Sequence, residues 1–498
     1  MRTEPAALRV PILRPAVAGQ PTAAHVLKSV PRPFVPLAFG AVLYGLVAMV
    51  GGQTYATNMW MVWLLGLFAY YVVTNDETAM CVLAFAMPFE FIFHAWGFGR
   101  YNMLSYAAIA LAIYRFSSSR VRKPLNLAEW ACVCLLIWSG FSLSWAQDLW
   151  QGVEILFTEA GLFSCLYVFR RGQTSPASVR TCLWYFIAGT VLLIGVMMLY
   201  YQRSTFRMHY TWVVVSALGA DEVSGYEVAG ASIVCFLAAL MLWELEKRNA
   251  ARIPLMACAF VLGMATFLAL SRSLILAWVT TSLVWAVMSP GIQRVKRIAL
   301  VLGLVGAAAF VGFSLNPGAA TIRFEVASNQ VLASDARGIT AGRNLFWDYG
   351  FQSFSENVLM GIGVGQFGQG FSKATGDPVN RGAHNVMLQM LVELGVPGVC
   401  LFALLCAALF VNAWRAGPWR HVALAWWVFF IFDSQAHGWN RNKSYWVVAG
   451  LTACLADYYN KKPVPAIFRR QQRLAAAGEN GYPPDPIRLR PRITGRHA

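Results

Sequence analysis

Apolar segments of membrane-spanning length recur along this chain and limit its fold more than any other feature. A helix of about 20 apolar residues crosses a hydrocarbon core about 30 Å thick. The pattern predicts an all-α, polytopic integral membrane protein with about fourteen transmembrane helices. The segments lie at roughly 34–51, 57–73, 79–96, 101–116, 128–146, 151–169, 181–200, 227–245, 253–270, 274–289, 298–315, 398–415, 421–437 and 444–458.

Composition supports the same fold class and excludes several functions. The chain is 58% hydrophobic and 13% charged, whereas soluble domains contain about 25% charged residues. The formal net charge of +17 does not indicate nucleic-acid binding, because the basic residues lie between the apolar segments and at both chain ends. The ten cysteines lie in or beside apolar segments. We therefore expect no disulfides and no thiolate metal site. The sequence has no H-E-x-x-H motif and no tight carboxylate cluster suited to a divalent metal, and we expect no metal and no cofactor.

Lysine and arginine are concentrated in alternate connections, which orients the chain by the positive-inside rule. The acidic pair Asp76 and Glu77 is the one inside connection that departs from the rule. The basic residues of the other inside connections are Arg120, Arg122, Lys123, Arg170, Arg171, Lys247, Arg248, Arg294, Lys296, Arg297, Arg415 and Arg420.

This orientation divides the chain into three parts with both termini in the cytoplasm. Residues 1–33 form a basic tail without a signal peptide, residues 34–460 form the transmembrane domain, and residues 461–498 form a basic tail that we expect to be disordered. Two long connections, at about 201–226 and 316–397, then lie on the outer side of the membrane, opposite the cytoplasm.

Two arginines stand out as candidates for anion binding. Arg272 lies between two apolar runs, where it either reaches the interface as a hairpin arginine or clamps an anion in an outer cavity. Arg343 opens an amphipathic segment, and its guanidinium suits a diphosphate or a surface salt bridge with Asp348 or Glu356. The aromatic residues predicted to share one face of this segment are Trp347, Phe351 and Phe354.

The run from Gly363 to Gly368 matches G-x-G-x-x-G, but we reject a dinucleotide site. No strand precedes the run, and no helix clearly follows it. We instead expect a tight turn in which the glycines adopt positive φ. Its backbone amides could also help to cradle a phosphate.

His384 precedes a segment with helical periodicity that starts at Val386 and that Gly395 and Pro397 are expected to end. A histidine in this place either caps or packs the helix, or acts in catalysis. Its polar neighbours in the sequence favour the catalytic role. The polar residues are Arg381 before the helix and Asn385, Gln389 and Glu393 along one face of it.

Further ionisable residues lie within the apolar segments and in the first long loop. Charged groups inside spans usually face a cavity or a partner. The span residues are Glu90, His94, Glu159 and Asp433. The loop at 201–226 mixes cations with aromatic residues, which suits sugar and phosphate contacts but is also common at membrane interfaces. These residues are Arg203, Arg207, His209, Tyr210 and Trp212.

Four motifs in order resemble the O-antigen ligase and O-antigen (exopolysaccharide) polymerase superfamily. They are SRS at 271–273, GRNLFW at 342–347, GIGVGQF at 361–367 and AHNVMLQMLVELGVPG at 383–398. The resemblance covers roughly 130–460. The sequence departs from the family pattern at Leu359-Met360, where proline is frequent, and at Ser273, where glycine is frequent.

The resemblance implies a metal-independent integral membrane glycosyltransferase, distantly GT-C-like, with a long helical extracytoplasmic loop. It implies a donor glycan on undecaprenyl diphosphate at the periplasmic face of the bacterial inner membrane. Arg272 and Arg343 would then bind the diphosphate and His384 would act on the acceptor hydroxyl. We expect substrate contacts from Arg203, Arg207, Arg381, Asn385, Glu393 and Glu159. Membrane lipid, a flippase and a chain-length regulator are the other candidate partners.

Three functions remain open from the sequence. A polymerase would join lipid-linked repeat units, and a ligase would transfer the glycan to lipid A-core on the same scaffold. A flippase or proton-coupled transporter for the lipid-linked glycan is the third. Transporters usually place charges at the midplane and often contain repeated halves. Since the polar residues here gather at the outer end and no repeat is visible, we rank transport last. We rank polymerisation before ligation by analogy alone, because polymerases are the more numerous and varied members of this superfamily.

Overall fold

The computed structural model describes most of the chain between the two tails. The described residues are 34–51, 53–89, 103–118, 123–199, 211–212, 223–246, 249–269, 271–289, 291–315, 321, 325, 343–376, 382–435 and 443–460. Their regular structure is helical apart from one antiparallel pair of two-residue strands, β1 (Thr211–Trp212) and β2 (Val223–Ser224). The predicted tails 1–33 and 461–498 lie outside the described residues.

Every apolar segment recognised in the sequence contains a described helix or part of one. The helices of the first half are α2 (Phe34–Gly51), α3 (Gln53–Thr74), α4 (Asp76–Ala86) with the short helix η1 (Met87–Phe89), α6 (Met103–Ser118), α7 (Leu127–Ser142), α8 (Leu149–Gly172) and α9 (Pro176–Leu199). Those of the second half are α10 (Gly225–Leu245), α11 (Asn249–Leu268), α12 (Arg272–Val287), α13 (Ile292–Leu315), α18 (Val386–Trp414), η4 (Gly417–Trp419), α19 (Arg420–Ser434) and α20 (Lys443–Tyr459). Two more, α16 (Asn344–Glu356) and α17 (Phe367–Thr375), belong to the predicted outer loop.

Six of the described helices are long and apolar enough to cross a membrane, namely α8, α9, α10, α11, α13 and α18. Shorter apolar helices accompany them, including α12 and most of α6. The chain is therefore an integral membrane protein with several transmembrane helices. The total of about fourteen crossings and the distant likeness to GT-C enzymes stay predictions.

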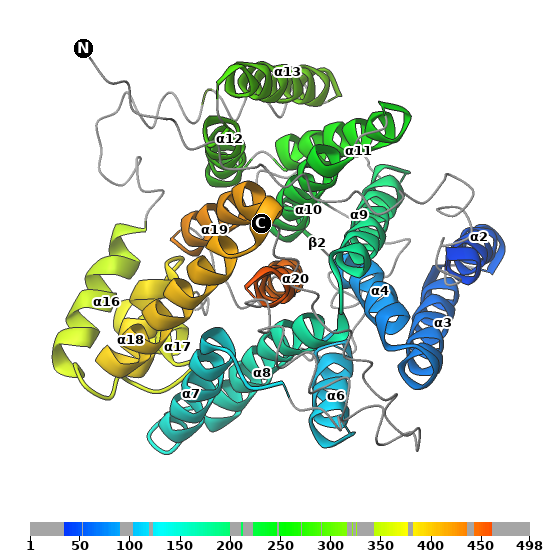
Figure 1. Ribbon diagram of the computed structural model, residues 1–498. Helices are drawn as coiled ribbons and strands as arrows, with labels where there is room; N and C mark the ends of the chain where they lie inside the picture. The colour runs from blue at the N-terminus through cyan, green and yellow to red at the C-terminus, as the bar shows by residue number, and fades with distance from the viewer. Residues whose placement is uncertain are drawn as a thin grey trace, which may run out of the picture.

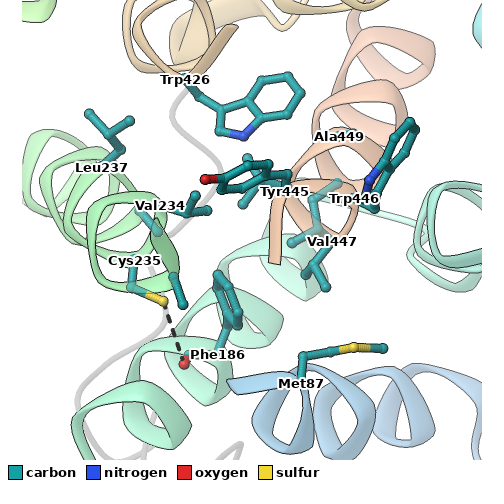
Figure 2. Close-up of a cluster of buried hydrophobic side chains, with 14 of the residues drawn as sticks. Met87, Phe186, Val234, Cys235, Leu237, Trp426, Tyr445, Trp446, Val447 and Ala449 are labelled. Atoms are coloured by element: carbon teal, nitrogen blue, oxygen red, sulfur yellow. Dashed lines mark hydrogen bonds between the residues drawn. The ribbon is translucent and has the colours of Figure 1, made fainter. Parts of the chain in front are cut away.

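Helix α20 lies at the centre of the bundle, between α8, α9, α10 and α19 (Figure 1). It is buried along almost its whole length. Figure 2 shows Trp446 of this helix in the same buried cluster as Phe186 of α9, Val234 of α10 and Trp426 of α19. A helix that is apolar on all sides belongs in such an interior position.

Ion pairs join the helices at the end of the bundle that the basic connections predict to be cytoplasmic. Arg170 at the end of α8 pairs with Glu129 of α7 and, at 2.9 Å, with Asp457 of α20. Arg180 near the start of α9 pairs with Glu246, which directly follows α10. The ends of α8 and α10 and the start of α9 therefore meet at one end, which we call the ion-pair end.

The acidic connection that departs from the charge rule also lies at the ion-pair end. Asp76 pairs with Arg115 of α6 at 3.3 Å, and Glu77 accepts a hydrogen bond from Thr174. Both acids lie in the first turn of α4, which Asn75 caps. Negative charge is favoured at a helix N-terminus. The two acids are thus accounted for without reversing the predicted orientation.

Helix α18 consists of two parts that meet at Gly395. This glycine has φ 65° and ψ −164°, which no residue of an α-helix adopts. A Cβ here would collide with the backbone carbonyl of Leu359, so only glycine fits. The predicted end of the helix at Gly395 is confirmed. The chain re-enters a helix at once, and its second part is the apolar segment predicted at 398–415.

Candidate functional site

Helices α16 and α17 pack on the first part of α18 and enclose a small apolar core (Figure 1). Trp347 and Phe354 of α16 pack against this core, as the amphipathic pattern predicts. The third aromatic residue of the predicted stripe, Phe351, is 60% exposed, so only part of the stripe is buried against this core. The buried residues of the core are Phe346, Phe367, Phe371, Ala383, Leu388 and Val392.

Residues 361–366 form a turn, which we call the glycine turn. Gly363 and Gly365 of the predicted run have φ of 100° and 77°, as expected, and the preceding Gly361 has φ of 67°. Gly368 lies in α17 and has no positive φ, so the expectation is wrong for this residue. The turn leads directly into α17, which the sequence analysis did not anticipate. A Cβ on Gly363 would lie 2.8 Å from Cα of Ala146, in the connection between α7 and α8. The turn therefore sits against the end of α7 and the start of α8.

The backbone amides of the turn are occupied by the protein itself. The amides of Ile362 and Gly363 donate to the carbonyls of Val392 and Glu393, each at 2.9 Å. The amide of Val364 donates to Oγ of Ser142 at 3.0 Å. The suggestion that these amides cradle a phosphate is therefore wrong.

The Glu393 side chain fixes the turn to α18. Its Oε2 accepts the amide of Gly365 at 2.9 Å, and its Oε1 accepts the amide of Phe367 and Nε2 of Gln389, each at 3.1 Å. The residue is 2% exposed. These contacts give Glu393 a structural role, because a carboxylate that accepts several donors holds their chain segments in place. Its predicted role in substrate binding stays a prediction.

Glu159 lies in α8 beneath the same turn. It follows Ile155 by one helical turn, and a Cβ on Gly365 would lie 3.1 Å from Cγ1 of Ile155. The Glu159 side chain is 1% exposed and interacts electrostatically with Glu393. Within the described part of the chain, its Oε2 makes no hydrogen bond. The structure thus places Glu159 and Glu393 in one buried polar region under the turn.

A second long-range contact holds the turn, through residues that the sequence analysis missed. The Gln366 side chain accepts the amide of Asp148 at 2.8 Å and donates to the carbonyl of the same residue at 2.9 Å. On the α18 side, Nε1 of Trp138 donates to the carbonyl of Leu394 at 2.9 Å. No local pattern links these residues, since more than 200 positions separate the partners.

Asn385, and not His384, caps α18. Its Oδ1 accepts the amide of Leu388 at 3.0 Å, and its Nδ2 donates to Oε1 of Gln435 at the end of α19, 3.2 Å away. His384 is exposed and has φ 52°, a left-handed conformation that is uncommon outside glycine. Its ring lies edge-on to Phe346, with 5.8 Å between centroids. His384 therefore projects beside α16 at the start of α18.

Arg343 lies immediately before α16 and is partly buried. Phe346 follows it by three residues and contacts the His384 ring, so the two candidate residues lie in one region. Within the described residues, no salt bridge joins Arg343 to Asp348 or Glu356. The local salt-bridge alternative is therefore not realised.

Arg272 is the first residue of α12 and is exposed. Ser271 caps the helix, because its hydroxyl accepts a hydrogen bond from the amide of Leu274 at 3.4 Å. Arg272 is therefore not the capping residue of α12. No hydrogen bond or ion pair of the Arg272 side chain occurs among the described residues. Arg170, Arg180 and Arg297, by contrast, all pair with carboxylates.

Helix polarity places Arg272 at the same end as the glycine turn. Arg297 at the start of α13 pairs with Glu244 near the end of α10 and stacks on Trp285 near the end of α12, 4.7 Å from the ring centroid. The end of α12 thus lies at the ion-pair end and its start at the opposite end. The start of α8, which contacts the turn, lies at that opposite end too. Helix α19 packs between α12 and α18 (Figure 1).

Two further protonatable side chains, Tyr349 and Asp433, lie in α16 and at the end of α19. Burial raises the pKa of Tyr349 in α16 above its usual value, so this phenol stays protonated near neutral pH. Asp433 accepts a hydrogen bond from the hydroxyl of Tyr445 at 2.7 Å in the interior. Within the described ranges, no group of three His, Cys, Asp or Glu side chains is arranged to hold a metal ion.

Several predicted residues lie outside the described part of the chain. They are the substrate-binding candidates Arg203, Arg207 and Arg381, together with Glu90, His94, His209 and Tyr210. Their predicted roles stay predictions.

Residues 257–403 match the family model described as O-antigen ligase. This part of the chain belongs to the O-antigen ligase family. The O-antigen ligase segment contains Arg272, Arg343, His384 and Glu393, whereas Glu159 lies before it. The resemblance seen in the sequence is confirmed, over a shorter stretch than expected. No curated protein matches the chain.

Proposed function

We propose that this protein is a polymerase. It would join undecaprenyl-diphosphate-linked oligosaccharide repeat units into a surface polysaccharide or exopolysaccharide at the periplasmic face of the bacterial inner membrane. One observation carries the proposal. Arg272 and Arg343 make no ion pair within the described residues, and both lie at the end of the bundle where His384 is exposed. Members of the matching family are glycosyltransferase-like enzymes that act on lipid-linked glycans.

The reaction needs charge compensation on the donor. The acceptor hydroxyl attacks the anomeric carbon, the bond from that carbon to the diphosphate oxygen breaks, and undecaprenyl diphosphate leaves with the bonding electrons. Arginine at a membrane interface stabilises this growing charge without a metal, because its planar fork matches phosphate oxygens. We assign this role to Arg272 and Arg343.

The acceptor hydroxyl also needs a base. Histidine is the side chain whose unperturbed pKa lies near physiological pH. His384 is exposed, lies in the region of Arg343, and is not needed as the cap of α18. We assign it the proton of the attacking hydroxyl. Arg203, Arg207, Arg381 and Asn385 are proposed to contact the glycan or its phosphates.

A ligase reaction on the same site is the second candidate, and the match to a family described as O-antigen ligase favours it. The donor chemistry is shared, and only the acceptor changes from a lipid-linked unit to lipid A-core. The buried Glu159 would also suit a proton-coupled transporter. Its neighbour Glu393, however, accepts hydrogen bonds from the amides of Gly365 and Phe367, which is a structural contact and not one that transport requires.

An acceptor assay in reconstituted vesicles tests the proposal. The purified protein receives a lipid-linked oligosaccharide alone, or together with lipid A-core, in the presence of EDTA. We expect a ladder of longer lipid-linked glycans from the donor alone. Product only on lipid A-core would make the protein a ligase, and donor movement across the bilayer without transfer would make it a transporter.

A further inference from the structure

The loop between α16 and the glycine turn has a fixed backbone. The amide of Gly361 donates to the carbonyl of Asn357 at 2.9 Å, which closes the loop. The amide of Val396 in α18 donates to the carbonyl of Val358 at 3.0 Å. Gly395 leaves no space for a Cβ beside the carbonyl of Leu359. The loop is therefore held against the break in α18.

This fixed loop exposes three consecutive apolar side chains. Val358 is 41% exposed, Leu359 69% and Met360 41%. We call these residues the apolar tip. Consecutive exposed apolar residues in a rigid loop are unfavourable in water and usually mark a contact surface. The tip belongs to the predicted outer loop, so the contact surface lies at the outer end of the bundle.

The apolar tip continues the outward-facing side of a membrane span. Val396, Cys400 and Leu404 follow one another at intervals of four residues along α18, and all three are exposed. In a transmembrane helix this exposed apolar face meets lipid. Since the amide of Val396 is hydrogen-bonded to Val358, the tip extends the lipid-facing side of the second part of α18 past the outer end of that part.

The neighbouring end of α7 and start of α8 carry a second set of exposed apolar side chains. Phe141 is 56% exposed, Leu149 58% and Trp150 75%. Tryptophan is enriched where a span leaves the hydrocarbon core. The glycine turn, which follows the apolar tip in the chain, contacts this α7–α8 connection through Gly363 and Ala146. Both sets thus lie near the level of the outer interface.

We propose that the apolar tip inserts into the outer leaflet of the membrane and thereby sets the depth of the glycine turn and α16. The partner is the phospholipid surface. A lipid-bound tip would keep the site at the level of the phosphates of a membrane-embedded donor. The proposal goes beyond transfer chemistry, and it can hold whether or not the polymerase assignment does.

A depth measurement tests the insertion directly. A spin label is placed by Leu359→Cys in the full-length protein, with Cys134→Ala and Cys400→Ala to remove the exposed thiols. The protein is reconstituted into phospholipid vesicles, and collisions with oxygen and with a water-soluble nickel complex are compared. Leu404→Cys on α18 gives the lipid reference, and Gln352→Cys on the exposed side of α16 gives the water reference.

We expect the label at position 359 to favour oxygen over nickel, as at position 404. A label that behaves as at position 352 would overturn the proposal. Shielding from both reagents would also overturn it, because that result indicates a protein contact such as a second copy of the chain. These readouts need no activity, so a failed polymerase assay leaves them interpretable.

A functional arm tests the role in setting depth. The double variant Leu359→Ser/Met360→Ser should lose transfer several-fold with donor embedded in vesicles, while its thermal unfolding stays near that of the wild type. Leu345→Ser is the matched control, because Leu345 is 54% exposed at the other end of α16. Equal transfer by the double variant and the control would overturn the depth-setting role.

Discussion

The ring of His384 lies edge-on to the ring of Phe346, with 5.8 Å between centroids and an angle of 71° between planes. The contact joins the start of α18 to α16. It brings His384 into the region of Arg343, which precedes Phe346 by three residues. The proposed base and a proposed anion-binding residue, which come from distant motifs, thus lie in one region at one end of the bundle.

Replacing His384 should separate catalysis from binding. His384→Asn is the suitable variant, since asparagine tolerates the left-handed backbone found here and cannot act as the base. We expect transfer to fall by about 10²–10⁴-fold. Donor affinity should persist, because we assign binding of the diphosphate to the two arginines. Weaker donor binding with unchanged turnover of bound donor would place His384 in binding instead.

Glu393→Gln should act through stability. The variant keeps one oxygen acceptor, so its NH₂ group faces the amide of either Gly365 or Phe367 and leaves that donor without an acceptor. Leaving a buried donor unsatisfied costs about 1–3 kcal/mol. We expect a lower midpoint of thermal unfolding, whereas the exposed Glu356→Gln should match the wild type. Loss of transfer with an unchanged midpoint of thermal unfolding would instead give Glu393 a role in substrate binding.

The glycine turn offers a matched pair of substitutions. Gly363→Ala adds a Cβ 2.8 Å from Cα of Ala146, at a φ of 100°. Gly376→Ala has a φ of 72° but no atom within 4 Å of its Cβ. The second variant should lose only the cost of a left-handed alanine, about 1–2 kcal/mol. Thermal unfolding should rank Gly363→Ala as clearly the less stable, and equal losses would argue against close packing.

Topology is tested by labelling in intact spheroplasts. Cysteine replaces the exposed Ala374 in the predicted outer loop, or the exposed Lys123 in an inside connection, in a chain lacking its exposed native thiols. A membrane-impermeant thiol reagent should label position 374 and spare position 123. The reverse pattern would invert the predicted orientation.

The sequence predicts the helices well because their apolar length and glycine breaks are local signals. The break at Gly395 and the positive φ of Gly363 follow from residue type alone. The exposure of Phe351 could not be predicted, because an amphipathic pattern does not tell a face that meets protein from one that meets lipid.

The supports of the site are not local and could not be predicted. Gln366 binds the backbone of Asp148, and the amide of Val364 binds Ser142. Each pair is brought together only when α7 and α8 pack beside α18. For the same reason the sequence suggested that the amides of the glycine turn bind a phosphate, whereas in the folded chain these amides donate to acceptors of the protein itself.

The central claim is that Arg272 and Arg343 together bind the diphosphate of the donor. Transfer and donor affinity are measured on purified Arg272→Ala and Arg343→Ala and on the corresponding lysine variants. The control is Arg415→Ala, which removes an exposed arginine at the end of α18. We predict that both alanine variants fold but lose most transfer and donor affinity. Lysine should restore only part, because it cannot make the bidentate contact, and Arg415→Ala should match the wild type. Transfer near the wild-type level in either alanine variant would contradict the account.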